Sequence, residues 1–411
     1  MTTAAVSSAH APVYLDFKLV LKASGVFGAL CIVVGLFSPD PVAFAAGAMV
    51  PWVCLRILYT PTMPAAVLYL FIWQWFQIFA RVLQAWVDGR SMSAGFTGQY
   101  IADAYWYMLS GLVVLAIVFR LAMTNLKPAT PAQRTAHFKW DTRHVVMLYV
   151  LGFVVSTAAV ALGRGGLAQP AEALARVKIV ALFMLFVYTM STGRGTRIML
   201  GVVLFEVGVG FTGFLSDFRS VFIFLGIAAI VAHIRWKFSV GVLSVVGLAS
   251  LTTLALFWTS VKADYREYAS QYSDSQAIVV PLSDRLAYLG SKVLTFGNTN
   301  FSETAYQLLT RFAYVDIFAS VIDVQQTSPE PIPMRQWKEA LEHVFQPRFL
   351  FPDKPELSDS EVYVRLTKRY LVDEVSQGTS ISVGYMGENY ADLGYPGMLA
   401  GIAFLGLILA L

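Results

Sequence analysis

Long apolar segments recur along the first 260 residues, and a long polar stretch follows them. Apolar runs of roughly 18 residues or more can cross a hydrocarbon layer about 30 Å thick. The runs are continuous rather than alternating, so we expect an all-α, polytopic transmembrane bundle and not a β-barrel. About ten spans are predicted, at residues 19–36, 42–59, 65–86, 104–123, 144–162, 174–190, 197–215, 219–235, 239–260 and 394–411.

The polar stretch, residues 262–392, differs from the rest in charge as well. It holds 18 acidic and 12 basic residues and has a net charge of −6, whereas the whole chain carries +4. We therefore expect three parts: a bundle of nine spans (1–260), one large, mainly helical outer-face loop domain (261–393) and a tenth span (394–411). The sequence stops inside this last apolar run, so we expect the natural protein to continue past Leu411.

Basic residues in the short loops predict the orientation of the bundle. The loops after the fourth, sixth and eighth spans carry Arg120, Lys127, Arg134, Lys139, Arg143, Arg194, Arg197, Arg235 and Lys237. Because such loops stay in the cytoplasm, the N-terminus is expected inside and the polar stretch outside. In a bacterium with two membranes, this is a multi-pass protein of the inner (cytoplasmic) membrane whose polar stretch faces the periplasm.

Composition narrows the candidate chemistry. Only 14% of the residues are charged, compared with nearer a quarter in soluble domains. The cytoplasmic loops account for the basic balance, so no nucleic-acid partner is expected. Cys31 and Cys54 fall inside predicted spans, where we expect small buried side chains rather than a disulfide. His343 is the only histidine of the polar stretch, which leaves no usual zinc site. We expect neither a metal nor a cofactor.

Two candidate residues begin the eighth predicted span, in Leu215-Ser-Asp-Phe-Arg-Ser220. Asp217 is placed to cap the helix that follows. Arg219 opposes the helix macrodipole there, and binding the phosphate of a lipid headgroup or a pyrophosphate would account for it. The alternative is that Arg219 reaches to the membrane interface without a ligand. Arg164 is a second outer-face arginine, in a glycine-flanked turn where it could equally be solvated.

Other sequence patterns and charged positions have structural explanations. Gly208-Val-Gly-Phe-Thr-Gly213 matches a dinucleotide-binding pattern but lies within a span, where small residues pack helices closely. Glu206 on the same span is either a functional intramembrane acid or a hydrogen-bond partner of a neighbouring helix. Residues 303–322 predict an amphipathic helix that carries Arg311. Arg266 follows the ninth span, at the membrane interface.

Two stretches of the polar region and the Arg219 turn carry a resemblance to a family. Val344-Phe-Gln-Pro-Arg-Phe-Leu-Phe-Pro-Asp-Lys-Pro355 resembles the "iPR-x-lwP-x-KP" segment of bacterial oligosaccharide repeat-unit polymerases, the Wzy-like O-antigen and exopolysaccharide polymerases. Residues 379–397, with Gly387-Glu-Asn-Tyr390, resemble their "GE-x-Y-x-nfG-x-xG" segment. Asp217-Phe-Arg-Ser220 resembles their "sR-s" helix entry. The likeness is specific only over these three stretches.

The resemblance implies an activity and roles for several residues. Such enzymes join repeat units carried on undecaprenyl pyrophosphate by transferring the growing glycan to an incoming lipid-linked unit. The departing pyrophosphate needs cations, for which we expect Arg219 first, then Arg348 and Lys354, with Arg164, Arg266 and Arg311 as further substrate contacts. The acceptor hydroxyl needs a base, for which Glu388 is the first candidate, followed by Asp217 and Asp353, and Tyr390 of the same segment would contact substrate.

Structural roles and other functions stay open. Glu388 could instead cap the last helix, and Arg348 could pair with Asp353. An O-antigen ligase would show a His-Asn or His-Ser element where this chain has Thr379-Ser-Ile-Ser382. A transporter of lipid-linked glycan would show broken or charged central helices and internal repeats. A non-catalytic partner of an assembly complex is a third alternative. Expected partners are the lipid-linked oligosaccharide, membrane lipid, a chain-length regulator and a flippase.

Overall fold

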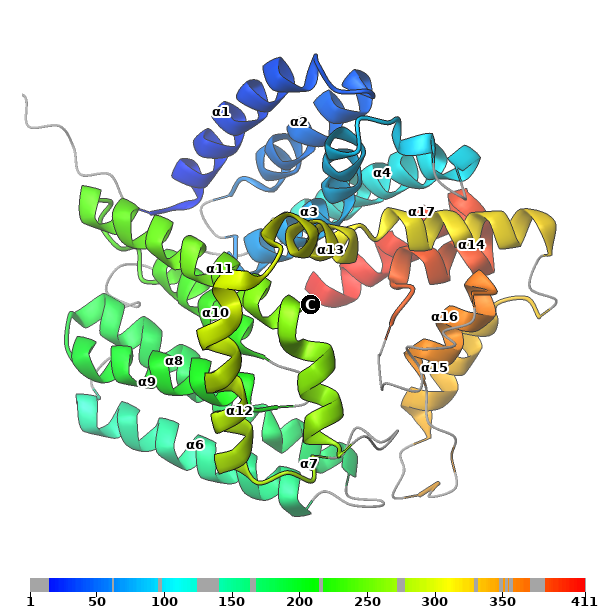
Figure 1. The fold of residues 1–411 in the computed structure, drawn as a ribbon. Helices are drawn as coiled ribbons and strands as arrows, with labels where there is room; N and C mark the ends of the chain where they lie inside the picture. The colour runs from blue at the N-terminus through cyan, green and yellow to red at the C-terminus, as the bar shows by residue number, and fades with distance from the viewer. Residues whose placement is uncertain are drawn as a thin grey trace, which may run out of the picture.

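The computed structural model is all-helical over the residues that it describes: 15–60, 63–94, 98–123, 140–162, 168–213, 217–271, 278–328, 332–346, 350–351, 354, 358–369 and 381–410. In Figure 1 the helices form two groups, the first made of residues 17–122, 315–327, 359–367 and 385–410 and the second of residues 142–295, with residues 301–312 between them. The α-helices are α1 (Phe17–Gly35), α2 (Pro41–Leu58), α3 (Ala65–Val87), α4 (Gly98–Ala122), α6 (Thr142–Leu162), α7 (Ala168–Ala175), α8 (Val177–Thr192), α9 (Thr196–Phe211), α10 (Phe218–Val231), α11 (Phe238–Ala269), α12 (Leu282–Thr295), α13 (Phe301–Phe312), α14 (Val315–Thr327), α15 (Arg335–Phe345), α16 (Asp359–Thr367) and α17 (Tyr385–Ala410). Two 3-10 helices, η1 (Met92–Ala94) and η3 (Phe296–Asn298), complete the set.

Eight stretches of helix in the described ranges are long and apolar enough to cross a membrane. They are α1, α2, α3, α4, α6, Pro170–Thr192, α11 and α17. A helical membrane protein is therefore confirmed at this level. The chemistry of the ends agrees with the sequence pattern, since Pro41 occupies the first turn of α2, where its missing N–H costs no hydrogen bond. Asp16 accepts the Leu19 N–H at the start of α1.

Two predicted spans are shorter in the structure than in the sequence pattern. Predicted span 197–215 corresponds to α9, with 16 residues, and predicted span 219–235 to α10, with 14 residues. At about 1.5 Å per residue these helices reach about 24 and 21 Å, less than a hydrocarbon layer. They are consecutive, so leaving both out of the count does not move the polar stretch to the other side of the membrane.

The first helix group has one large apolar core. It is built from α2, α3 and α4 together with α14, α16 and α17. Phe318 and Val321 of α14 are almost fully buried in it. The polar stretch therefore does not form a core of its own, and the boundary expected at residue 261 does not separate two domains with separate cores. The predicted single helix over 303–322 is two helices, α13 and α14, because the chain turns at Ala313 and Tyr314.

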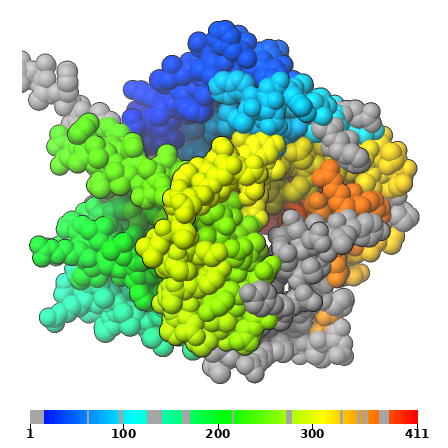
Figure 2. Space-filling view, in the orientation of Figure 1, coloured from blue at the N-terminus to red at the C-terminus, as the bar shows by residue number. Residues whose placement is uncertain are grey.

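The second group has smaller cores. One joins α6, α8, α9 and α10, and another joins the adjoining ends of α9 and α10 to α11 and α12. Contacts of α10 with α3 and of α13 with α11 connect the two groups. In Figure 2, α12 and α13 (yellow) cover the visible face between the blue helices of the first group and the green helices of the second.

The chain reverses sharply inside α17. Gly394 has φ 65° and ψ −171°, a conformation that is essentially restricted to glycine. A Cβ added at Gly401 would lie 1.9 Å from Asn389 Oδ1, although twelve residues of straight helix would separate the two by about 18 Å. The first arm, 385–393, therefore folds back along the second arm, 395–410.

Candidate functional site

Arg219 lies in the first turn of α10, where the sequence predicted a phosphate contact. Its side chain is exposed, and no ion pair or hydrogen bond joins it to the residues that the structure describes. Its guanidinium acts electrostatically on the hydroxyls of Tyr69, from α3, and Tyr314, at the start of α14. An exposed cation beside two hydroxyl groups can hold an anion through charge and hydrogen bonds together.

Glu388 lies in the first turn of α17 and is partly buried. It experiences the charges of Asp359, Asp392 and Arg365. Asp359, in the first turn of α16, also acts on Tyr314. The Tyr314 hydroxyl thus lies within electrostatic range of both Arg219 and Asp359, and Asp359 lies within range of Glu388 as well. We call Arg219, Tyr314, Asp359 and Glu388 the junction cluster.

Burial dominates the titration of Tyr314 at this cluster. Loss of hydration raises the pKa of the Tyr314 hydroxyl, and the Asp359 carboxylate raises the pKa further, while Arg219 acts in the opposite direction. The phenol therefore stays protonated near neutral pH and can donate a hydrogen bond. Together with the arginine, it gives the cluster a donor side, and the carboxylates of Asp359 and Glu388 give it an acceptor side.

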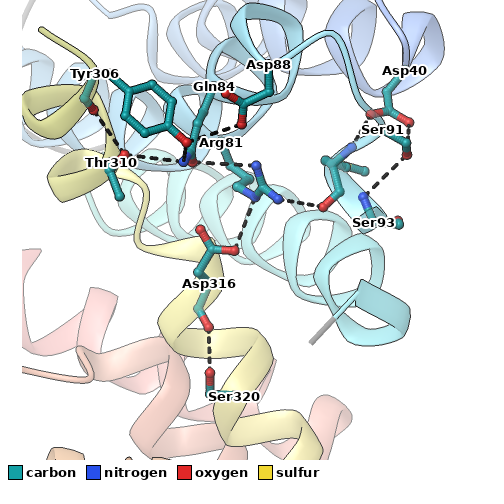
Figure 3. Close-up of polar contacts among 11 residues, drawn as sticks. Asp40, Arg81, Gln84, Asp88, Ser91, Ser93, Tyr306, Thr310, Asp316 and Ser320 are labelled. Atoms are coloured by element: carbon teal, nitrogen blue, oxygen red, sulfur yellow. Dashed lines mark hydrogen bonds and ion pairs between the residues drawn. The ribbon is translucent and has the colours of Figure 1, made fainter. Parts of the chain in front are cut away.

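A buried ion pair fixes α14 beside the cluster. Arg81, only 7% exposed on α3, places its Nε 3.1 Å from Asp316 Oδ1 of α14. Its Nη2 donates to the Met92 carbonyl oxygen at 2.7 Å (Figure 3). Loss of hydration raises the pKa of the Asp316 carboxyl, although the positive charges of Arg81 and Arg369 oppose this shift. The pair joins two segments that lie far apart in the sequence.

Hydrogen bonds extend this network onto α13. Gln84 Nε2 donates to Tyr306 Oη at 3.2 Å and to Thr310 Oγ1 at 3.3 Å. Tyr306 Oη in turn donates to Asp88 Oδ2 at 3.3 Å (Figure 3). The backbone N–H of Tyr314 donates to the carbonyl of Gln77 at 3.3 Å, so α13 lies along the second half of α3. This network fixes Tyr314 relative to the bundle.

The first arm of α17 is hydrogen-bonded to the start of α15. Both oxygens of Asp392 accept backbone N–H groups at the start of α15, from Gln336 at 3.2 Å and Trp337 at 2.9 Å. A carboxylate at a helix N-terminus satisfies amides that have no partner within the helix and complements the helix dipole. Asn389 Oδ1 accepts the Trp337 indole N–H at 3.1 Å. The segment that resembles the polymerases thus has a structural role in addition to presenting Glu388.

A bidentate ion pair between Arg365 and Glu339 joins α16 to α15. Arg365 donates to both carboxylate oxygens of Glu339, at 3.1 and 2.8 Å, and to Gln336 Oε1 at 2.7 Å. Arg335 also pairs with Glu339, at 2.7 Å. Two parallel N–H···O bonds fix the relative orientation of both side chains. Arg365 therefore holds α16, and with it Asp359, in place.

Two predicted site residues have structural surroundings. Tyr390 is buried, with its ring 5.4 Å from Phe318 and 6.1 Å from Tyr107, so its ring packs within the first core. Lys354 is 8% exposed, and its Nζ donates to the carbonyl oxygens of His343 and Gln346, each at 2.6 Å. A cation at the C-terminus of α15 complements the helix dipole, so this lysine is neither solvated nor presented to a ligand.

The remaining predicted residues are spread over the molecule. Asp217 occupies the N-cap position of α10, but its carboxylate accepts from the Ser220 hydroxyl instead of from the helix backbone. Arg266 lies in the last turn of α11, and Arg311 is exposed in the last turn of α13. Arg164, Arg348 and Asp353 lie outside the described residues. Within the described ranges, no group of three or more His, Cys, Asp or Glu side chains could hold a metal.

The sequence reasoning missed Arg81 and Lys178. Each is an ionisable residue within an apolar stretch, which is a signal of function or pairing in itself. Lys178 pairs with Glu206 at 2.8 Å, and Tyr149 Oη donates to the same carboxylate at 2.5 Å. Glu206 therefore bonds to neighbouring helices, as one of its two interpretations expected.

One family model matches the chain. It describes a domain of unknown function, DUF8712, and it covers residues 39–411. No curated protein and no solved structure matches the chain. Because the match takes in the first helix group from α2 onward, the second group and the junction cluster together, the chain belongs to the DUF8712 family.

Proposed function

We propose that this protein is a membrane glycosyltransferase that polymerises undecaprenyl-pyrophosphate-linked oligosaccharide repeat units into O-antigen or exopolysaccharide. The reaction takes place at the periplasmic face of the bacterial inner membrane. The growing glycan moves to a hydroxyl of an incoming lipid-linked unit, and undecaprenyl pyrophosphate departs. The main support is the junction cluster, in which Arg219 and Glu388, from two stretches that resemble the polymerases, act on the linked pair Tyr314 and Asp359.

The chemistry of the transfer assigns a role to each side of the cluster. Negative charge develops on the departing pyrophosphate, and Arg219 with the Tyr314 hydroxyl would stabilise it. The acceptor hydroxyl must lose a proton as the new glycosidic bond forms. Glu388 is the candidate base, because it matches the glutamate of the polymerase segment and lies within electrostatic range of Asp359.

Arg219→Ala and Glu388→Gln test the proposal in a strain of the source organism that lacks the chromosomal gene. We expect both variants to abolish the ladder of long chains on a polysaccharide gel while single repeat units are still made and displayed. Arg235→Ala and Glu342→Gln, exposed residues away from the cluster, are the matched controls and should keep the ladder. A normal ladder from Arg219→Ala, at equal protein level, would refute the assignment.

A transporter of lipid-linked glycan is the second candidate. The reversal of α17 at Gly394 and the buried Lys178–Glu206 pair favour it, since transporters use interrupted helices and intramembrane charge. The gene-deleted strain separates the candidates. Loss of a polymerase leaves single repeat units exposed outside the inner membrane, whereas loss of a transporter keeps them on its cytoplasmic side. An O-antigen ligase would leave long chains on the lipid carrier and none on lipid A.

A further inference from the structure

A cavity of about 170 Å³ lies in the second helix group, apart from the junction cluster. Its polar lining residues are Lys178, Glu206, Asp217 and Ser220, and its apolar wall includes Ile179, Leu182, Val209, Val221 and Phe224. Lys178 is in the first turn of α8, Ser220 is in the first turn of α10, and Gly210 lies near the end of α9. The cavity therefore lies at one end of these three helices.

The charges of the cavity are held in fixed positions. Glu206 is 5% exposed, and both of its oxygens are engaged, one by Tyr149 at 2.5 Å and the other by Lys178 at 2.8 Å. Lys178 keeps two further ammonium hydrogens that no oxygen in the described ranges accepts. Its Nζ also lies 5.5 Å from the ring centre of Phe153. Glu206 thus acts as a positioning residue that aims the lysine.

The cavity offers a site for an anion on one side. Lys178, in the first turn of α8, supplies its positive charge and donates only one of its three ammonium hydrogens to Glu206. The Ser220 hydroxyl lies on the Asp217 side of the cavity, because it donates to that carboxylate. Asp217 supplies the opposite charge: its side chain is exposed, lines the cavity and makes no hydrogen bond to the α10 backbone. A ligand that satisfies both sides must carry an anion and a hydrogen-bonding cation a few atoms apart.

We propose that this cavity binds the headgroup of a zwitterionic aminophospholipid, phosphatidylethanolamine, with its phosphate at Lys178 and its ammonium at Asp217. The apolar wall receives the glycerol end of the lipid. Phosphatidylglycerol lacks the ammonium group, and the quaternary nitrogen of phosphatidylcholine has no N–H to donate to Asp217. Selectivity for the primary amine is therefore the property that distinguishes this site from general lipid contact.

Lipid retention by the full-length protein, measured by native mass spectrometry after release from mixed micelles, tests the proposal. We expect phosphatidylethanolamine to be retained about tenfold better than phosphatidylglycerol or phosphatidylcholine, as for one charge-assisted hydrogen bond. Asp217→Asn should remove this preference, and Lys178→Met should reduce the retention of every phosphate headgroup. Asp141→Asn and Lys237→Met, exposed residues on other helices, should behave like the wild type.

Lys178→Met leaves Glu206 without its cation and could unfold the protein, so Lys178→Arg is measured beside it. The arginine keeps the charge and the ion pair, and it should retain the lipid. Equal retention of the three lipids by the wild type would overturn the proposal, as would a wild-type preference in Asp217→Asn. Displacement of the lipid by equimolar phosphoethanolamine without acyl chains would overturn the assignment to a lipid.

Discussion

Arg81 in the first helix group and Lys178 in the second are both cations on apolar helices, yet their surroundings differ. Arg81 is 7% exposed and bonds to Asp316 and to a backbone carbonyl within a large core. Lys178 keeps 22% of its side chain exposed and lies beside a cavity. Taking a charged side chain out of water is unfavourable unless it is paired, and each of these cations has a carboxylate partner.

The difference separates two uses of a buried ion pair. In the first group the pair joins the polar stretch to the bundle, and its cation, Arg81, is held by Asp316 and by a backbone carbonyl. In the second group, the lysine retains hydrogen-bonding capacity toward an open space. Buried pairs are weak contributors to net stability, but removing one partner is strongly destabilising because the other charge stays behind. The first group should therefore respond to mutation mainly through stability, and the second also through ligand binding.

The largest effect is expected from Arg81→Met. The substitution leaves the partly exposed Asp316 carboxylate without its Arg81 partner, and we expect the free energy of unfolding to fall by about 2–3 kcal/mol. Thermal unfolding of the purified protein in detergent measures it. Arg90→Met, at an exposed position just beyond α3, is the control and should change stability by no more than about 0.5 kcal/mol. A loss below about 1 kcal/mol in Arg81→Met would mean that Asp316 has another partner.

Two glycine substitutions, one in each group, should change the free energy of unfolding by an intermediate amount and in opposite directions. Gly401→Ala places a Cβ against Asn389, whose amide is held by Trp337 and by the Tyr385 carbonyl, so we expect a loss of about 1–3 kcal/mol. Gly208→Ala on α9 meets no atom within 4 Å and should gain up to about 1 kcal/mol from helix propensity. Thermal unfolding in detergent measures both changes. If the two variants shifted stability in the same direction, the contrast in packing between the groups would be contradicted.

The smallest effect on stability is expected at the edge of the first group, for the ion pair between Arg365 and Glu339. Burial alone would raise the pKa of Glu339, but hydrogen bonds and charge from Arg365 and Arg335 outweigh it and lower the pKa below 4.5. The stabilisation is present above that value and is lost as the pH falls through the lowered folded-state pKa.

We expect Glu339→Gln to cost no more than about 1 kcal/mol at pH 7 and progressively less as the pH is lowered through the reduced pKa of Glu339. Unfolding curves over this range test it, with Glu342→Gln, an exposed position on the same helix, as the control. A difference between Glu339→Gln and the wild type that stays constant with pH would rule out the ion pair as its source.

Local pattern was sufficient for most of the helices and for two residues of the candidate site. Continuous apolar length predicted the crossing helices, a charged residue at a helix start identified Arg219, and the resemblance to the polymerase segment identified Glu388, because each signal lies within a few residues. The same reasoning overestimated α9 and α10, since each predicted span runs past the C-terminal end of its helix, at Phe211 in α9 and at Val231 in α10.

The position of α14 could not be predicted in this way. Asp316 and Asp323 give the segment the polarity of a surface helix, yet its other face is buried in the first core. That burial depends on Arg81, a partner from a distant part of the sequence, and local spacing does not reveal such pairings. The burial of Tyr390 and Lys354 could not be predicted for a related reason, because a short motif does not show whether its side chains face solvent or the protein interior.

The arrangement of the first core has a consequence for the order of events during synthesis. Helix α4 packs against both α14 and α17, and α17 is the last helix described. Residues 123–314 must be synthesised before α14 begins, and until then the buried face of α4 has neither partner. Lipid or an insertion factor must cover that face until α17 emerges from the ribosome. The earliest helices of the chain are therefore among the last to reach their final packing.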